Sequence, residues 1–278
     1  MIALKLWGTR GSLATPGLDT VKYGGNTACV EVRGQDGTLL ILDAGTGIRL
    51  LSTALDPNLT EIHLLLTHLH MDHIQGLGFF GPLYNPRTHV HIWGPASHIV
   101  RLSARLGRYM SPPLFPVRLM ELPCKLTIHE IPHTPFTIGE FTIMGEFICH
   151  PGPTVGYRIT SQSKSIAYIP DHEPALGTTY PLSVDWLSGY KIANNVDLLI
   201  HDAQYSPEEY PHHIGWGHSS LHDACHYANA VQAARMLPFH YDPRHNDAFM
   251  DNLMYRAQSE VALNFDLIPA YEGHVYHV

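Results

Sequence analysis

Short stretches of alternating or continuous apolar residues fill the first third of the chain, and glycine-containing segments separate them. Residues 2–7, 28–32 and 38–42 have this pattern, which is typical of strands joined by turns. Residues 48–55 instead have the apolar spacing of a helix. Residues 61–67 read as a buried strand that ends directly at a group of histidines.

The rest of the chain continues as short strands with occasional helices. Strands are expected at 91–93, 125–131, 136–147, 157–160, 165–169 and 196–200, and helices at 97–106, 221–237 and 247–258. Two strand-rich halves meeting near residue 130 favour two packed sheets with helices outside, an α/β (α+β) chain forming a single domain over 1–278. Residues 81–124 contain a proline-rich stretch and would form a lid or an interface element.

Composition limits the classes of function. The chain has 278 residues, 45% of them hydrophobic, and can bury a sizeable core. Its formal net charge of −8 argues against a broad basic surface for long nucleic acid, though not against a small anionic substrate. The four cysteines are far apart, so neither disulfides nor a cysteine zinc site are expected. No signal-peptide or membrane-span pattern occurs, so a soluble cytoplasmic protein is expected.

Histidine is the unusual component, because 21 histidines exceed the 17 lysines and arginines together. Four potential ligands, His68, His70, Asp72 and His73, occur in the run THLHMDH directly after the buried strand. The first two would lie on one side of an extended turn and the other two near a helix start. Imidazole and carboxylate groups at this spacing suit Zn²⁺, Mn²⁺ or Fe²⁺ at two neighbouring positions.

This run resembles the metal-binding motif of the metallo-β-lactamase superfamily, and further segments follow in that family's order along nearly the whole chain. These segments are LILDAGTG (40–47), CHPGPTVGYRI (149–159), SIAYIPD (165–171) and LPFHYDPRH (237–245). The resemblance implies the family's four-layer αββα sandwich, in which Asp43 would orient a ligand.

The resemblance also implies a complete ligand set for two divalent cations, with Zn²⁺ expected and Mn²⁺ or Fe²⁺ as alternatives. His68, His70, His150 and Asp171 would hold one cation, and Asp72, His73, Asp171 and His240 the other. With two carboxylates and a bridging hydroxide, such a centre would keep a net charge of about +1 and attract an anionic ester. The bridging hydroxide would be the nucleophile.

Two more segments, LLIHDAQY and GWGHSS, resemble the tRNase Z-like branch, in which a histidine and a carboxylate protonate the departing oxygen. This makes His218 the general acid and Asp202 its orienting group, and Asp72 completes the implied catalytic residues. Arg244 would either hold a phosphate or brace a carboxylate. The chain departs from the family in having Pro170-Asp171-His172 instead of Gly-Asp-Thr, and in having aspartate instead of glutamate at 202.

The substrate is the most open part of this interpretation. Only 20 residues separate His150 from Asp171, so the tRNA-gripping arm that tRNase Z inserts there has no counterpart. The segments 8–12 and 22–32 resemble small-substrate phosphodiesterases, and their glycine turns could present backbone N–H groups to a phosphate. Tyr109, Met110 and Phe115 could stack on a base or simply pack as a loop or dimer contact.

The sequence therefore predicts a metal-dependent hydrolase, a phosphodiesterase acting on a small, cyclic or linear nucleotide-like diester. One alternative is a tRNase Z-type RNA 3′-end nuclease, and another is a metal-binding signalling module without turnover. Relatives of this kind are often homodimers, so a homodimer is expected by analogy. No membrane partner is expected, and long nucleic acid is disfavoured as a partner.

Overall fold

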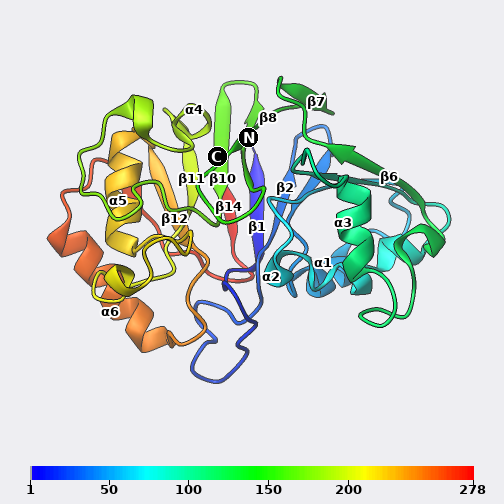
Figure 1. The fold of residues 1–278 in the computed structure, drawn as a ribbon, viewed down its shortest axis with the longest axis horizontal. Helices are drawn as coiled ribbons and strands as arrows, with labels where there is room; N and C mark the ends of the chain where they lie inside the picture. The colour runs from blue at the N-terminus through cyan, green and yellow to red at the C-terminus, as the bar shows by residue number, and fades with distance from the viewer. Residues whose placement is uncertain (1) are drawn as a thin grey trace.

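The structure, a computed structural model, describes residues 2–278 apart from the side chain of Asp185. Two seven-stranded sheets face each other at the centre of the molecule, and helices cover their outer faces (Figure 1). The first sheet has the order β14-β1-β2-β3-β4-β5-β6. Its strands are β1 (Ala3–Gly8), β2 (Cys29–Arg33), β3 (Leu39–Leu42), β4 (Glu61–Leu65), β5 (His89–Gly94), β6 (Lys125–Glu130) and β14 (Val275–His277).

The second sheet has the order β13-β12-β11-β10-β9-β8-β7. Its strands are β7 (Phe136–Ile138), β8 (Phe141–Phe147), β9 (Val155–Ser161), β10 (Lys164–Ile169), β11 (Leu198–Asp202), β12 (Arg235–Phe239) and β13 (Asp266–Leu267). The chain passes from the first sheet to the second between Glu130 and Phe136. That the whole chain is one domain stays a prediction.

Parallel pairing brings the functional segments to one edge. Strands β3 to β6 are parallel to one another, and so are β10 to β13. Parallel strands end at the same side of a sheet, so the segments that follow β3, β4, β10, β11 and β12 all emerge together. These five segments carry most of the residues singled out from the sequence.

The helices form the two outer layers. They are α1 (Ile48–Ala54), α2 (Met71–Ile74), α3 (Leu102–Tyr109), α4 (Tyr190–Ala193), α5 (Leu221–Ala230) and α6 (Asp247–Glu260), with short 3₁₀ turns at Leu77–Phe79, Gly81–Tyr84, Leu119–Glu121, Val184–Trp186 and Tyr210–His212. The first three helices lie outside the first sheet and the last three outside the second, so the predicted αββα arrangement is confirmed (Figure 1). Within the described residues, no helix combines the length and apolarity that crossing a membrane requires.

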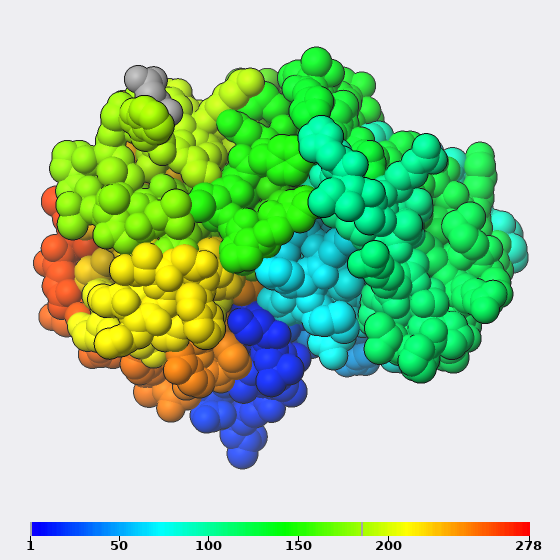
Figure 2. Space-filling model, in the orientation of Figure 1, coloured from blue at the N-terminus to red at the C-terminus, as the bar shows by residue number. Residues whose placement is uncertain are grey.

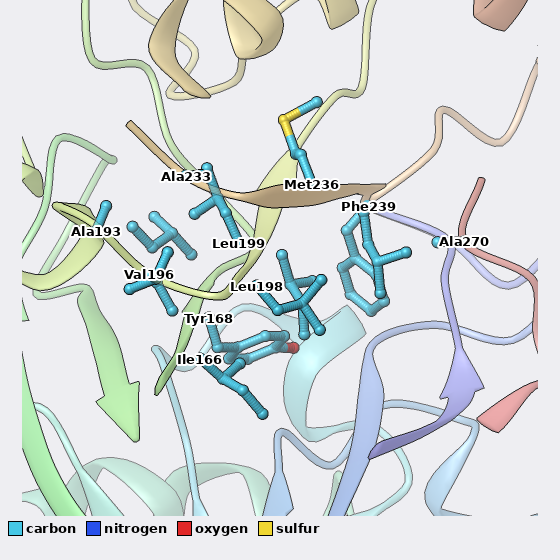
Figure 3. Packing of buried hydrophobic residues seen from close by; sticks show 14 of the residues in the cluster. Ile166, Tyr168, Ala193, Val196, Leu198, Leu199, Ala233, Met236, Phe239 and Ala270 are labelled. Carbon is cyan, nitrogen blue, oxygen red and sulfur yellow. The ribbon is translucent and has the colours of Figure 1, made fainter. Parts of the chain in front are cut away.

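Alternation of side chains along the strands builds two cores. On β4, Leu65 faces the second sheet, while Ile62 and Leu64 face the helices outside. The larger cluster fills the space between the sheets and continues under α5 and α6. Figure 3 shows part of it, where Tyr168 of β10 and Phe239 of β12 lie with their ring centroids 5.9 Å apart.

The sequence interpretation was wrong about the secondary structure in three places. The expected helix 221–237 is helix α5 followed by strand β12, because the chain turns at Gln232, whose φ is +55°. The expected strand 136–147 is a hairpin of β7 and β8 that turns at Gly139. The helix expected at 97–106 runs instead from Leu102 to Tyr109.

The proline-rich stretch packs into the molecule. Met110 is fully buried and Phe115 nearly so, both in the core between the first sheet and its helices. The Phe115 ring lies 5.9 Å from the Phe79 ring, edge to face. The Tyr109 hydroxyl donates to the carbonyl of Gln75 at 2.6 Å. Met110 and Phe115 therefore do not form a base-stacking surface, and the packed-loop alternative is the correct one for them.

Candidate metal centre

The run THLHMDH changes from strand to helix within a few residues. Strand β4 ends at Leu65, and helix α2 begins at Met71 after an extended His70. Because of this sharp change, His68 and His70 lie on the loop between β4 and α2, while Asp72 and His73 lie in the first turn of α2. His68, Asp72 and His73 are buried, whereas His70 is exposed and therefore lies at the entrance.

The first group of potential ligands combines this loop with two later segments. It contains His68, His70, His150 and Asp171, whose donor atoms all lie within 4.8 Å of one another. The Oδ2 atom of Asp171 is 3.6 Å from His68 Nε2 and 3.8 Å from His150 Nε2. His150 Nε2 is 3.2 Å from His70 Nδ1. Four donors therefore surround one small volume.

The second group shares Asp171 with the first. It contains Asp72, His73, Asp171 and His240, again with all donor atoms within 4.8 Å. His240 Nε2 lies 2.9 Å from Asp72 Oδ2 and 3.3 Å from Asp171 Oδ2. His73 Nε2 lies 3.0 Å from Asp171 Oδ1. The structure thus brings together all seven residues that the sequence interpretation singled out as ligands.

The donor atoms fit two divalent cations. His68 Nε2 and Asp171 Oδ1 are buried, yet neither has a partner in hydrogen-bond geometry among the described residues. Asp171 Oδ1 approaches His73 Nε2 to 3.0 Å without that geometry. Buried polar atoms left unpaired are costly unless a ligand satisfies them. Three imidazoles and a carboxylate, or two imidazoles and two carboxylates, are donor sets typical of Zn²⁺ and similar ions.

Asp43 fixes the orientation of His73. Its φ of +59° turns the carboxylate inward at the end of β3. There Asp43 Oδ2 receives the Nδ1–H of His73 at 2.8 Å and the hydroxyl of Tyr168 at 2.9 Å, and Oδ1 receives the backbone N–H of Thr67 at 2.7 Å. A histidine that donates through Nδ1 keeps the lone pair of Nε2 for a metal.

Two other ring nitrogens are held in the same way. His150 Nδ1 donates to the carbonyl oxygen of Gly217 at 2.8 Å, and His240 Nδ1 donates to Gln204 Oε1 at 2.9 Å. Gly217 has a φ of +87°, and a Cβ there would lie 2.4 Å from His150 Nδ1, so glycine is required for this approach. These contacts fix both rings with Nε2 directed at the shared Asp171.

The charged groups shift one another's pKa in opposite directions. Burial lowers the pKa of His68 well below its usual value, and it lowers that of His150 to about 4. Burial would lower the pKa of His73 as well, but the carboxylates of Asp171, Asp72 and Asp43 outweigh it and raise that pKa. His68 and His150 are therefore neutral at pH 7, the form that binds a metal.

Beside the two groups, His218 and Asp202 form a close pair. Asp202 ends β11 and is fully buried, and its Oδ2 receives His218 Nδ1–H at 2.6 Å. The His218 ring stacks on His240 at 4.9 Å and lies 5.0 Å from His150. Burial alone would lower the pKa of His218, but Asp202 and the neighbouring carboxylates raise it to about 9. His218 is thus held as an acid next to the point where the two groups meet.

The loop after β1 supports the second group. The backbone N–H of Ser12 donates to Asp72 Oδ2 at 2.7 Å. Arg10 is fully buried and ties this loop to the segment after His240, because its Nη1 donates to the carbonyls of Asp242 and His245 at 3.0 and 2.6 Å.

The backbone N–H groups that the sequence suggested for phosphate binding are therefore already in use. The N–H of Ser12 is bound by Asp72, and that of Gly25 donates to Glu272 Oε2 at 2.9 Å. Arg244 binds the Asp242 carboxylate through Nε and Nη2, each at 2.9 Å, so the carboxylate-bracing alternative is the one observed.

Sequence reasoning missed three groups that position the ligand side chains. Gln204 holds His240, the Thr67 hydroxyl contacts Nδ1 of His68 at 3.1 Å, and the N–H of Ser12 holds Asp72, yet none of the three has a ligand-type side chain. One signal was available for Gln204, since it lies two residues after Asp202 at a strand end. His172, the departure beside Asp171, is buried and bonds through Nδ1 to His201 Nε2 at 2.9 Å, so the altered turn is filled by a second histidine.

The segments that carry these residues meet on one face of the molecule. Figure 2 shows the blue N-terminal loop, the cyan segment near residue 75, the green segment near 150 and the yellow segment near 210 converging at its centre. These segments come from both sheets and from both halves of the chain. Fold and site together define a two-sheet protein with a histidine- and aspartate-rich candidate metal centre at the sheet edge.

Comparison with known proteins places the chain in a family. A family model described as "Beta-lactamase superfamily domain" matches residues 38–241, most of the chain. The chain therefore belongs to the beta-lactamase superfamily, and the predictions of a metallo-β-lactamase fold and of a hydrolase are confirmed.

Individual relatives agree with this assignment. The ribonuclease Z of Thermoplasma acidophilum is 25% identical over 286 residues, covering 88% of each chain. Among solved structures, the metallo-β-lactamase fold protein YhfI from Bacillus subtilis has a TM-score of 0.70 at 20% identity, with 99% of this chain and 98% of that chain covered. A diphosphatase from the PhnP family has a TM-score of 0.68 at 18% identity, with 100% and 98% covered. The structural likenesses show the fold.

Proposed function

We propose that the chain is a two-metal phosphodiesterase that hydrolyses a small, nucleotide-like and preferably cyclic phosphodiester. The observation that carries this proposal is the His218–Asp202 pair, which lies beside two ligand groups that share Asp171. A centre that only stored metal would have no use for an oriented acid at that position. Phosphodiester cleavage needs one, because an alkoxide leaves poorly without a proton.

His68, His70, His150 and Asp171 would hold one cation, and Asp72, His73, Asp171 and His240 the other. Bound there, the cations would supply Lewis acidity towards the phosphoryl oxygens and acidify a water nucleophile at neutral pH. The ligand set accepts Zn²⁺, Mn²⁺ or Fe²⁺.

The protein's own contribution is proton delivery. Asp202 occupies Nδ1 of His218, so the transferable proton is on Nε2. Asp202 itself is locked by the backbone N–H groups of Ser219 and Gln204, at 3.0 and 3.1 Å. With a pKa of about 9, His218 is protonated at neutral pH and can donate to the departing oxygen.

Two features support a small substrate. Strands β9 and β10, which lie between His150 and Asp171, are joined directly at Gln162 and Ser163, which leaves no room for a substrate-gripping arm there. The net charge of −8 opposes extended binding of nucleic acid. The diphosphatase from the PhnP family, with 98% of its chain covered, shows that the same fold occurs in a protein named for a phosphate substrate.

The test compares leaving groups. His218→Ala should slow hydrolysis of a cyclic nucleotide, whose leaving oxygen is an alkoxide, by roughly 10²–10⁴-fold. An activated nitrophenyl diester needs no proton for departure, so its hydrolysis should fall less than about tenfold. Asp202→Asn should show the same selectivity with a smaller loss. Full activity of His218→Ala on the cyclic nucleotide would remove the proton-delivery role.

A second candidate is a tRNase Z-type RNA 3′-end nuclease. It is favoured by the ribonuclease Z relatives, including one of Halalkalibacterium halodurans that is 26% identical and covers 77% of this chain and 80% of its own. A panel of cyclic nucleotides, dinucleotides and a pre-tRNA separates the two. Efficient pre-tRNA trimming with slow cleavage of small diesters would replace the first proposal by the second. Failure on every diester at full metal loading would favour a metal-binding module.

A further inference from the structure

A cluster of histidines lies on the first sheet away from the centre described above. His63 on β4, His89 and His91 on β5 and His129 on β6 alternate with residues of the outer core, so all four side chains are on the sheet face that looks toward the second sheet. The parallel register pairs His63 with His91. His63 precedes His68 by five residues, which span at most about 16 Å of extended chain.

Glu61 joins two of these histidines at the start of β4. Its Oε1 atom lies 3.2 Å from His63 Nε2 and 3.6 Å from His91 Nε2, and all three donor atoms are within 4.8 Å of one another. Ligand atoms placed about 2.0–2.1 Å from a tetrahedral zinc ion are separated by about 3.3–3.4 Å. The observed spacings bracket that value, so the three donors need little movement to share one ion.

His91 offers a free lone pair. His91 Nε2 is buried and has no hydrogen-bond partner among residues 2–278. On the other side of the ring, His91 Nδ1 lies 2.9 Å from His129 Nε2, a contact that can hold the His91 proton on Nδ1. Burial lowers the pKa of His91 to about 4 and also lowers that of His63, so both rings are neutral at pH 7.

We propose that Glu61, His63 and His91 form a further binding site for one transition-metal cation of the Zn²⁺ class. Three protein donors leave the fourth position of a tetrahedral ion to water. The Glu61 side chain is 62% exposed, and a surface pocket lined by residues 36–39, 59–61, 63, 138 and 139 opens beside it, so the ion reaches the site from solvent.

Trp93 allows a further test of the proposed metal site, because its indole N–H donates to His63 Nδ1 at 3.2 Å. That bond places the His63 proton on Nε2, facing Glu61. A cation on Nε2 moves the proton to Nδ1, where it faces the indole N–H, so Trp93 opposes binding. Trp93→Phe removes the opposing donor and keeps an aromatic ring in place. It should tighten binding about tenfold, the equivalent of one hydrogen bond.

The experiment is equilibrium dialysis of the folded protein against Co²⁺, with bound metal measured by elemental analysis and by the visible absorption of four-coordinate Co²⁺. Wild type should bind one equivalent more than His63→Ala or His91→Ala. This difference does not depend on how many ions the other cluster holds. Phosphodiester hydrolysis should be unchanged in both variants, because the two sites share no residue.

Matched variants decide the outcome. His89→Ala removes a histidine from the same strand and face that is bound to Thr127 at 2.8 Å, and it should bind as much Co²⁺ as wild type. Should the alanine variants not fold, Glu61→Gln at the exposed carboxylate should weaken the extra equivalent at least tenfold. Equal binding by wild type, His91→Ala and Glu61→Gln would overturn the proposal and leave the cluster as stacked neutral side chains.

Discussion

Asp171 is the residue on which the two ligand groups depend. Its Oδ2 faces His68 and His150, and its Oδ1 faces His73. His70 belongs to one group only. We therefore expect Asp171→Asn to lower bound metal at both positions, whereas His70→Ala should lower it at one. Elemental analysis after gel filtration measures both, and two full equivalents retained by Asp171→Asn would contradict the shared-ligand geometry.

The raised pKa of His218 predicts the alkaline side of the pH–rate profile. The proposed proton delivery needs the acid form of His218, and that form persists up to a pKa of about 9. The rate on a cyclic nucleotide should therefore be constant through neutral pH and fall as the pH rises through about 9. Removing the charge in Asp202→Asn should move this fall to lower pH. A profile with the same alkaline limb in His218→Ala would assign that limb to another group.

The residues that could be predicted are those whose side chains themselves have ligand chemistry. His68, His70, Asp72 and His73 stand in one short run, and the spacing alone indicated their use. Gln204 could not be predicted in the same way. Its amide matters only because β11 and β12 are neighbours in the sheet, which places it 2.9 Å from His240 Nδ1.

At the scale of elements, the loop after β1 packs directly against the second ligand group. A Cβ on Gly11 would lie 2.2 Å from His240 Nδ1, so Gly11→Ala must displace that imidazole. We expect at least a tenfold loss of metal affinity, in the range found when a ligand's supporting contact is removed. Isothermal titration with Zn²⁺ after chelation measures it, and an unchanged affinity would show that the loop yields instead.

Gly107 provides the matched control for that substitution. It lies inside helix α3, and nothing is within 4 Å of a Cβ placed there. Gly107→Ala should leave metal affinity unchanged and raise the free energy of unfolding by about 0.5–1 kcal/mol, because alanine restricts the unfolded chain and favours helix. Chemical denaturation tests this gain.

The error at residues 221–237 has a physical cause. Apolar residues continue from α5 into β12, interrupted only by Gln232 and Arg235, and Pro238 lies inside a strand that pairs on both sides with parallel neighbours. A short apolar run buried on both faces has no period that separates strand from helix. The helix stops at Ala230 because Gln232 takes a left-handed conformation, a preference that glutamine itself does not signal.

For the molecule as a whole, histidines kept neutral by burial or partial burial predict loss of stability in acid. Burial lowers the pKa of His91, His150 and His201 to about 4. Between pH 6.5 and 4 these histidines bind protons in the unfolded chain but stay neutral in the folded chain. The free energy of unfolding therefore decreases as the pH falls through this window. His73 and His218 have raised pKa values and are protonated in both the folded and the unfolded state near pH 4.

Guanidinium denaturation of the chelated protein at pH 7 and pH 5 measures this effect. His201→Gln removes one such group, which belongs to neither ligand group, and should reduce the drop, whereas substitution of the exposed His98 should not. A midpoint that is the same at both pH values would mean that the folded protein accommodates the protons.

The overall architecture was accessible from the sequence, because both halves alternate strands and helices and the chain changes sheets close to residue 130. The sequence did not predict the pairing of β14 with β1, because a strand of three residues is too short to show an alternation of apolar and polar positions. Sequence analysis therefore described the two layers of sheet but left the edge of the first one open.

That pairing has a practical consequence. Ile2 and Val278 exchange two backbone hydrogen bonds of 3.0 Å, and the two ends of the drawn chain lie together in Figure 1. A short linker could join them, and new ends could be cut at the exposed turn between Gln162 and Ser163. Such a circular permutant would place Asp171 near its beginning and His150 near its end, so that metal binding would report directly on whether the rearranged chain has folded.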